Sequence, residues 1–141
     1  MTRPPFSEII PAVLYLGGAR KAETLRAGGI RFIVNVTHKR YDGRRRHFPL
    51  SDGYNDPQRL LAVVACLQRR CRRRQVPLYI HCRLGWSRSP VVAAVFLVKR
   101  GRFRTFRQAM RFVKRVHPST RPTRGMLASG RAAVRLLGAK K

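Results

Sequence analysis

The stretch from residue 76 to residue 100 constrains the fold more than any other part of the chain. A short apolar run, Val76 to Ile80, leads into a polar loop, and residues 90 to 100 are then apolar on nearly every side of a helix. An apolar strand of this kind is typical of a buried parallel sheet, and a helix that is apolar all round must be covered by other elements. The stretch therefore predicts a strand and a helix inside an α/β domain.

The rest of the chain alternates between strand and helix patterns in the same way. Strands are expected over residues 13–16, 30–36 and 47–50, and helices over 19–27, 57–73 and 123–137. Gly17 and Gly18 are expected to form a turn, and the spacing of Thr105 and Gln108 predicts a capping box that begins a further helix. This alternation predicts one domain over residues 1–141, with a central, mainly parallel sheet of about five strands flanked by helices.

The chain is strongly basic. Lysine and arginine total 32 against five acidic residues, which gives a formal charge of +27. Such a charge predicts attraction to polyanions: nucleic acid, an anionic membrane surface or a phosphorylated substrate. Because 26 of the 32 basic residues are arginine, the coding bias of a GC-rich genome would explain the excess equally well, and both explanations stay open.

The cysteines and the apolar runs predict where the protein works. Cys66, Cys71 and Cys82 are odd in number and lack the spacing of a disulfide framework. Residues 1–12 hold no apolar core long enough for a signal peptide, and the longest apolar run, residues 91–98, is too short to span a bilayer. We therefore expect an intracellular protein, cytoplasmic or nuclear, with association with a virus particle left open.

The loop between the buried strand and the buried helix carries the chemistry. Cys82 ends the strand, and Arg88 follows six positions later, just before the helix. Backbone N–H groups of such a loop converge on an anion, and the helix dipole adds positive charge that also favours a thiolate. Arg88 can bind two phosphate oxygens, and Gly85 is expected to let the loop backbone approach the ligand closely. These features predict phosphoryl transfer through cysteine.

Residues 81–90, HCRLGWSRSP, resemble the H-C-x5-R-S/T signature of cysteine-dependent protein phosphatases, and the S-R-S-P ending looks like their dual-specificity branch. The resemblance covers nearly the whole chain, since VLYLGGARKAETLRAGGIRFIVNVT is similar to the family's opening strand, helix and strand and FPLSDG resembles its acid loop. Position 82 argues against the low-molecular-weight branch, whose C-x5-R lies near the N-terminus, and rhodanese-like phosphatases lack the surrounding pattern. The resemblance implies hydrolysis of phosphotyrosine and phosphoserine or phosphothreonine through a phosphocysteine, with no cofactor and no metal.

The resemblance also implies roles for individual residues. Cys82 matches the nucleophile, and Ser89 matches the hydroxyl that assists thiolate departure, although it would also serve as a plain helix N-cap. His81 matches the histidine that orients the loop and helps to hold the thiolate. The phosphate-binding loop comprises Arg83, Leu84, Gly85, Trp86, Ser87 and Arg88.

A proton donor for the leaving oxygen must come from the few acidic residues. Asp52 lies 30 residues before Cys82, in the turn after a predicted strand, and matches the family's acid in position and spacing. Asp56 is the alternative acid, although it is better placed to cap the helix that begins at Pro57. Asp42 lies among arginines and is expected to be a solvated loop residue.

Several residues depart from the family's pattern. Trp86 stands where smaller or differently shaped residues are usual, so it either walls the mouth of the pocket and stacks on an aromatic substrate or simply packs. His117-Pro118 replaces the common Arg-Pro, and Pro122-Thr123 replaces Pro-Asn, which leaves open how the last helix is fixed. Cys66 and Cys71 lie on a predicted helix, where packing in the core is expected and a redox partnership with Cys82 is the alternative.

The substrate is a phosphorylated protein in the first hypothesis. The charge also suits an RNA 5′-phosphatase or a phosphoinositide phosphatase, but RNA-directed relatives usually carry N-R-T-G in place of S-R-S-P. Inositide-directed relatives tend to carry extra lysines in the loop, where this chain adds only Arg83. A basic module that binds polyanions without catalysis is a third hypothesis, which the presence of Cys82, Arg88 and Ser89 disfavours.

A second, very basic loop lies between two predicted strands, over residues 37–47. Its cations are expected to recruit the anionic surroundings of the phosphate, such as acidic residues of a protein substrate or a polyanion including nucleic acid. A solvated run of charge produced by compositional bias is the alternative. The residues concerned are His38, Lys39, Arg40, Arg44, Arg45 and Arg46.

Overall fold

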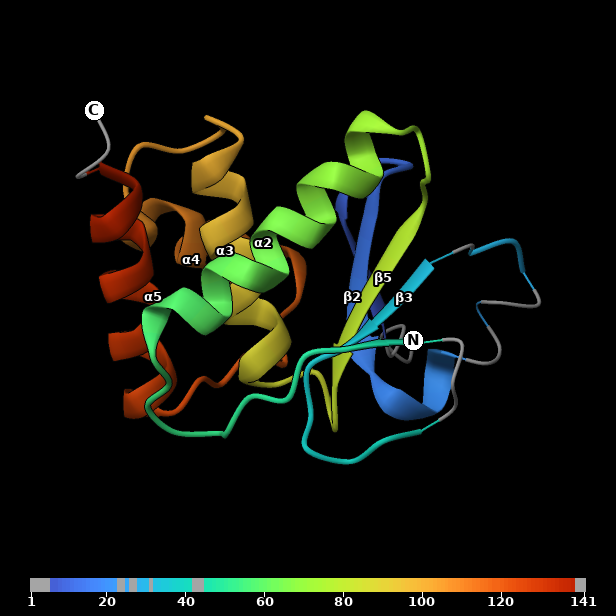
Figure 1. Ribbon diagram of the computed structural model, residues 1–141, viewed down its shortest axis with the longest axis horizontal. Coiled ribbons are helices and arrows are strands. Elements are labelled where there is room, and N and C mark those ends of the chain that lie inside the picture. The colour runs from blue at the N-terminus through green and yellow to red at the C-terminus, as the bar shows by residue number, and fades with distance from the viewer. Residues whose placement is uncertain (1–5, 23–24, 26–27, 31, 42–44, 139–141) are drawn as a thin grey trace.

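The computed structural model describes the chain except for residues 1–5, 23–24, 26–27, 31, 42–44 and 139–141. It contains a five-stranded sheet with helices packed against it (Figure 1). The strands are β1 (Phe6–Ile10), β2 (Leu14–Gly18), β3 (Phe32–Asn35), β4 (Arg46–His47) and β5 (Leu78–Cys82). The helical elements are the 3-10 turn η1 (Ala19–Lys21) and the helices α2 (Pro57–Arg72), α3 (Arg88–Lys99), α4 (Phe106–Val116) and α5 (Arg124–Gly138).

The sheet is parallel apart from one edge strand, as expected. Its order is β1-β2-β5-β3-β4, and only β1 runs antiparallel to its neighbour. β5 pairs with strands on both sides and is buried along its whole length. Because β2, β3 and β5 are parallel, their carboxyl ends meet at one edge of the sheet, with Gly18 beside Cys82 and Asn35 beside His81.

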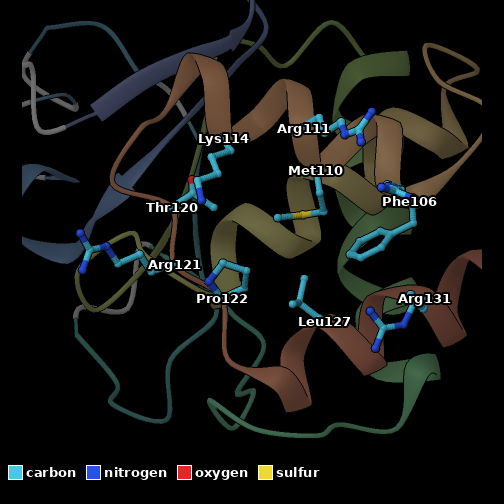
Figure 2. A pocket seen from close by; sticks show the side chains of 10 residues that line it. Phe106, Met110, Arg111, Lys114, Thr120, Arg121, Pro122, Leu127 and Arg131 are labelled. Atoms are coloured by element: carbon cyan, nitrogen blue, oxygen red, sulfur yellow. The ribbon is translucent and has the colours of Figure 1, made fainter.

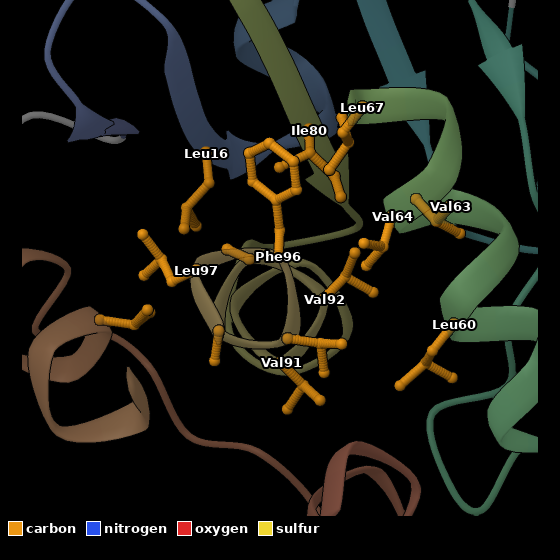
Figure 3. Packing of buried hydrophobic residues seen from close by; sticks show 14 of the residues in the cluster. Leu16, Leu60, Val63, Val64, Leu67, Ile80, Val91, Val92, Phe96 and Leu97 are labelled. Atoms are coloured by element: carbon orange, nitrogen blue, oxygen red, sulfur yellow. The ribbon is translucent and has the colours of Figure 1, made fainter. Parts of the chain in front are cut away.

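α3 is the centre of the helical layer and follows β5 directly. Every residue from Ser89 to Leu97 is buried, which confirms the expected buried helix. Helices α2 to α5 lie together beside the sheet, with α3 among them (Figure 1). Seen along its axis, α3 projects apolar side chains in several directions, toward Leu16 of β2 and Leu60 of α2 among others (Figure 3).

The two faces of β5 serve different clusters. Leu78, Ile80 and Cys82 belong to the main core on the helical side. Tyr79 belongs to a second, smaller cluster with Ile33 of β3, because side chains alternate along a strand. His81 stacks beside Tyr79 with ring centroids 6.1 Å apart, so it lies on that second face. Neighbouring residues of the signature therefore face opposite sides of the sheet.

The two predicted helix caps, at the starts of α2 and α4, are both present. The Asp56 carboxylate accepts a hydrogen bond of 2.9 Å from the N–H of Gln58 at the start of α2, and the capping box between Thr105 and Gln108 is present at the start of α4. Both helices therefore begin where side-chain acceptors satisfy their first free N–H groups.

Two expectations about the first quarter of the chain need correction. Gly17 and Gly18 do not form a turn, because both lie within β2. β1 was not predicted, since Ser7 and Glu8 interrupt its apolar run, and it forms by pairing with β2. The helix expected over residues 19–27 begins with the 3-10 turn η1, and residues 23–24 and 26–27 of that prediction lie outside the described residues.

Candidate active site

The cysteine and the serine of the signature lie in contact. Cys82 is the last residue of β5, and Ser89 is in the first turn of α3. Their Sγ and Oγ atoms are 3.3 Å apart, and both residues are buried. The Ser89 hydroxyl is thus placed to donate a hydrogen bond to a thiolate at Cys82.

The loop that joins them turns its carbonyl groups toward the rest of the protein. The Nε2 atom of His117 donates to the Gly85 carbonyl at 2.8 Å, and the backbone N–H of Arg121 donates to the Trp86 carbonyl at 2.6 Å. In a trans peptide the following N–H points the opposite way. Within the described part of the chain, no hydrogen bond uses the N–H groups of residues 83–87, so the loop presents donors to an anion.

Gly85 is required by the sheet beneath the loop, which is a constraint that the sequence did not reveal. Its φ is +77°, and a Cβ atom there would lie 2.7 Å from the carbonyl carbon of Gly17 in β2. The expectation was that Gly85 lets the loop approach a ligand. The structure shows a close approach of two backbones that only glycine permits, and the role toward a ligand stays a prediction.

Arg88 holds the start of α3 to the acid loop. Its Nη1 donates to the Leu50 carbonyl at 3.1 Å. Its Nε is buried and has no hydrogen-bond partner among the described residues. A buried guanidinium nitrogen without an acceptor is costly unless a ligand supplies one. A phosphate oxygen is an acceptor that suits this geometry.

Asp52 lies in the loop that Arg88 contacts, two residues after Leu50, and its side chain is exposed. Asn55 fixes this loop: its Oδ1 accepts from the N–H of Ser51 at 2.9 Å, and its own N–H donates to Ser129 Oγ at 2.8 Å. Asp56 is engaged as the cap of α2. Asp52 therefore stays the predicted proton donor, with an exposed side chain in the loop that Arg88 contacts. The bracing role of Asn55 was missed, because nothing in the sequence marks its distant partner.

His81 is completely buried behind the cysteine. Its Nδ1 lies 2.9 Å from the Cys82 carbonyl oxygen, and its Nε2 lies 3.1 Å from Nη1 of Arg45. Because a guanidinium can only donate, Nε2 accepts, and the proton of a neutral imidazole is on Nδ1, which donates to the Cys82 carbonyl. This arrangement fixes the peptide from which the Cys82 side chain projects.

Arg45 is one of the six cationic residues of the basic loop, and the structure separates it from its exposed neighbours. Its side chain is buried and lies over the Tyr41 ring, 4.6 Å from the ring centroid. His38, Lys39 and Arg46 are exposed. Asp42 and Arg44 lie outside the described residues. Sequence alone carries no signal that distinguishes Arg45 from its neighbour.

Three large apolar side chains are exposed around the loops of the site. The exposed fraction is 61% for Tyr54, 53% for Leu84 and 48% for Trp86. Trp86 therefore does not pack in the core, and a role at the mouth of the pocket stays a prediction. A cleft of about 380 Å³ lies between the signature loop and the basic loop. It is lined by Thr37, His38, Lys39, Tyr41, Arg83 and Arg88.

The residues that depart from the family's pattern make direct contacts with the loop. His117 links it to β1, because its Nδ1 lies 2.7 Å from Ser7 Oγ while its Nε2 donates to Gly85. Burial lowers the pKa of His117, which favours the neutral ring. The Thr123 N–H donates to Ser87 Oγ at 3.1 Å, so the approach to α5 is also fixed to the signature loop.

The other two cysteines lie on α2. Cys66 is buried, and Cys71 is half-buried against the main core. Burial raises the pKa of the Cys71 thiol. These positions support the expected packing role for both.

Comparison with known proteins agrees with this geometry. Residues 14–129 match the family model of the dual specificity phosphatase catalytic domain. The protein-tyrosine-phosphatase IBR5 of Arabidopsis thaliana is 30% identical over 117 residues, which are 81% of this chain and 45% of that protein. The chain thus spans less than half the length of this relative.

Solved structures show the same fold. A mouse protein described as a dual specificity phosphatase, crystallised with zinc tungstate, has a TM-score of 0.83 and 28% identity, covering 99% of this chain and 92% of that one. A structure of human DUSP28 has a TM-score of 0.82 and 24% identity, covering 99% and 100%. The second of these supports the fold alone. With the family match over most of its length, the chain belongs to the dual specificity phosphatase catalytic domain family.

Proposed function

We propose that the chain hydrolyses phosphomonoesters on proteins, at phosphotyrosine and at phosphoserine or phosphothreonine, through a phosphocysteine at Cys82. One observation carries the proposal. Arg88 begins the helix whose first turn holds Ser89 against Cys82, and its buried Nε lacks an acceptor among the described residues. A site with a nucleophile, open backbone donors and an unsatisfied guanidinium needs a tetrahedral anion to complete it.

In the first step, the Cys82 thiolate attacks phosphorus. The S–P bond forms as the ester P–O bond breaks, and the Asp52 carboxylic acid gives its proton to the leaving oxygen. The equatorial oxygens lie against the N–H groups of the loop and the Arg88 guanidinium. These donors are already oriented before the substrate binds, so they need little reorganisation in the transition state.

In the second step, water attacks the phosphocysteine. The water oxygen bonds to phosphorus, the S–P bond breaks, and the Asp52 carboxylate takes the proton from water. Ser89 donates a hydrogen bond to Sγ as the thiolate leaves, at the position where the two atoms are now 3.3 Å apart. His81 acts through the Cys82 carbonyl and is a positioning residue.

The surroundings of the loop favour substrates with acidic neighbours. The cleft beside the cradle carries the cations of His38 (when protonated), Lys39 and Arg83 and no acidic residue among those that the structure describes. A phosphorylated protein with acidic side chains near the phosphate would place them there. Binding of nucleic acid or another polyanion would use the same charge. No helix in the described part of the chain is long and apolar enough to cross a bilayer. From the number and spacing of the cysteines, we propose an intracellular protein.

The test compares the wild type with Cys82→Ser on a small aryl phosphate, phosphopeptides, RNA 5′-ends and phosphoinositides. We expect turnover of aryl phosphate and phosphopeptides by the wild type, loss of turnover in the serine variant, and retained binding of phosphopeptide to that variant. Residual turnover near wild type would refute the cysteine mechanism. Preferred turnover of RNA ends or inositides would keep the mechanism and replace the substrate.

A further inference from the structure

A groove separate from the phosphate site runs between α4 and α5 (Figure 2). Its volume is about 660 Å³. Residues 120–122, which connect the two helices, border it, and side chains from both helices enter it. No part of the proposed reaction uses this groove.

The groove has an apolar surface of a size that suits side chains of a partner. Phe106 and Met110 come from α4, Leu127 comes from α5, and Pro122 comes from the connection (Figure 2). Phe106 is buried, while the other three are half-buried and accessible from the groove. Covering such partly exposed apolar surface is favourable in water.

Cations surround this apolar surface. Five of the ten lining residues are basic, all five are exposed, and none of the lining residues within the described chain is acidic. They are Arg107, Arg111, Lys114, Arg121 and Arg131. Like charges around one groove repel one another, so an anionic occupant would relieve that repulsion.

The combination of surfaces indicates the kind of occupant. Arginine is abundant over the whole chain, so cations alone would not single out this groove. A nucleic acid would satisfy the cations but would leave the aliphatic surface of Met110 and Leu127 without a matching group. A protein segment with acidic side chains on either side of bulky apolar ones matches both. We propose that the α4–α5 groove binds an acidic segment of a protein partner that carries such apolar side chains.

The groove is connected to the signature loop, which suggests that the partner is also a substrate. The backbone N–H of Arg121, a lining residue, donates to the carbonyl of Trp86 at 2.6 Å. Trp86 is half-exposed beside the phosphate cradle. A partner segment that extends from the groove past Arg121 therefore reaches the mouth of the phosphate site. This part of the inference rests on the proposed function, whereas binding of the segment itself does not.

The test uses two synthetic peptides. The first is an unphosphorylated segment of aspartate and glutamate with leucines spaced three and four residues apart, and the second has serine in place of each leucine. Binding to the intact chain is measured by fluorescence anisotropy at low and at physiological salt. We expect the leucine peptide to bind about tenfold more tightly than the serine peptide, since burying apolar side chains adds to the charge attraction. Equal affinity for both peptides would overturn the proposal, because the apolar surface would then be unused.

Charge-reversal variants locate the binding. Arg111→Glu with Lys114→Glu changes the groove, and Arg69→Glu with Arg72→Glu makes the same change in charge on exposed positions of α2. We expect the groove variant to lose about tenfold or more in affinity and the α2 variant to lose less than threefold. Equal losses would mean attraction to net charge only. Thermal unfolding confirms that both variants are folded, and Met110→Gln tests the apolar surface without a change in charge.

A phosphotyrosine peptide extended by the leucine segment tests the link to catalysis. The groove variant should raise KM for this peptide and leave turnover of an aryl phosphate unchanged. If the wild type does not hydrolyse the aryl phosphate, the proposed function fails. Binding of the segment to the groove is still decided separately, by the anisotropy measurements. The groove variant could instead lose binding of a single-stranded oligonucleotide and keep binding of the leucine peptide. The groove would then be a nucleic-acid surface, and the proposal would be overturned.

Discussion

The signature loop and the basic loop lie at the same edge of the sheet, but they are held in different ways. Residues 83–87 are fixed mainly through their backbone: His117 and Arg121 donate to loop carbonyl groups, and Gly85 packs closely on Gly17. The basic loop after β3 is fixed through side chains, since Asn35 donates to the Lys39 carbonyl at 2.7 Å and accepts from the Thr37 N–H at 2.9 Å.

The difference has a consequence for function. A loop whose chemistry depends on backbone N–H groups tolerates changes in its exposed side chains, provided that its glycine and its anchors remain. In a loop whose chemistry depends on charged side chains, adjacent residues of the same type can have different roles. Arg45 is buried against His81 while Arg46 is exposed over the Phe48 ring.

The largest effect is expected where the signature loop uses a side chain directly. Arg88→Lys should lower kcat/KM for aryl phosphate by about two to three orders of magnitude, because an ammonium cannot reproduce the planar fork that serves the transition state. Both binding and rate should suffer, as measured by steady-state kinetics and by phosphate-analogue binding. A lysine variant within about threefold of wild type would show that backbone donors alone hold the phosphate.

The acid loop should give the next largest effect. Asp52→Asn is expected to lower kcat by about a hundredfold for substrates with poor leaving groups and much less for activated aryl phosphates, since only the former need a proton. The basic limb of the pH–rate profile should flatten. Asp56→Asn is the control and should leave both the rate and the stability nearly unchanged, because the asparagine Oδ1 caps a helix about as well as aspartate does. If Asp56→Asn shows these kinetic effects and Asp52→Asn does not, the proton donor is Asp56.

Arg45 gives the sharpest comparison between the two loops. Arg45→Met removes the donor to His81 and frees the imidazole tautomer, so we expect kcat to fall about tenfold with KM for aryl phosphate little changed. Imidazole NMR should report loss of the single tautomer with the proton on Nδ1. Arg46→Met, at the exposed neighbour, should change neither. Equal effects of the two substitutions would contradict the separation of their roles.

The exposed cations should give the smallest effect. Neutralising His38, Lys39 and Arg46 together should raise KM for acidic phosphopeptides by about threefold to tenfold at low salt, and the effect should shrink as salt is added. Turnover of a small aryl phosphate should stay nearly constant, because that ligand reaches only the cradle. Arg45 is left intact in this variant, since its loss would disturb His81. If KM for the acidic peptide does not change at low salt, compositional bias is the better explanation of these residues.

The sequence was informative where function depends on local pattern. The apolar run that forms β5, the loop from Cys82 to Ser89 and the apolar run that forms α3 follow one another in the chain. The strand–loop–helix arrangement is therefore predictable from local sequence. Asp56 and Thr105 were also predictable, because a cap lies next to the N–H groups that it satisfies.

The residues that were missed act over long separations. Arg45 reaches His81 across 36 positions, Asn55 reaches Ser129 across 74, and Ser7 reaches His117 across 110. β1 forms only because β2 offers an edge to pair with. The constraint that Gly17 of another strand places on Gly85 was also missed. Such contacts are set by tertiary packing and leave no periodic or local signal in one sequence.

The most direct test of the central claim is to find the phosphoryl group on the enzyme. Ser89→Ala should slow hydrolysis of the intermediate more than its formation, because the hydroxyl that stabilises the departing thiolate is lost. Rapid quenching during turnover, followed by mass spectrometry, should then show one phosphoryl group, located on Cys82. A phosphoryl group on another residue, or turnover that persists in Cys82→Ser with no phosphorylated enzyme, would contradict the account.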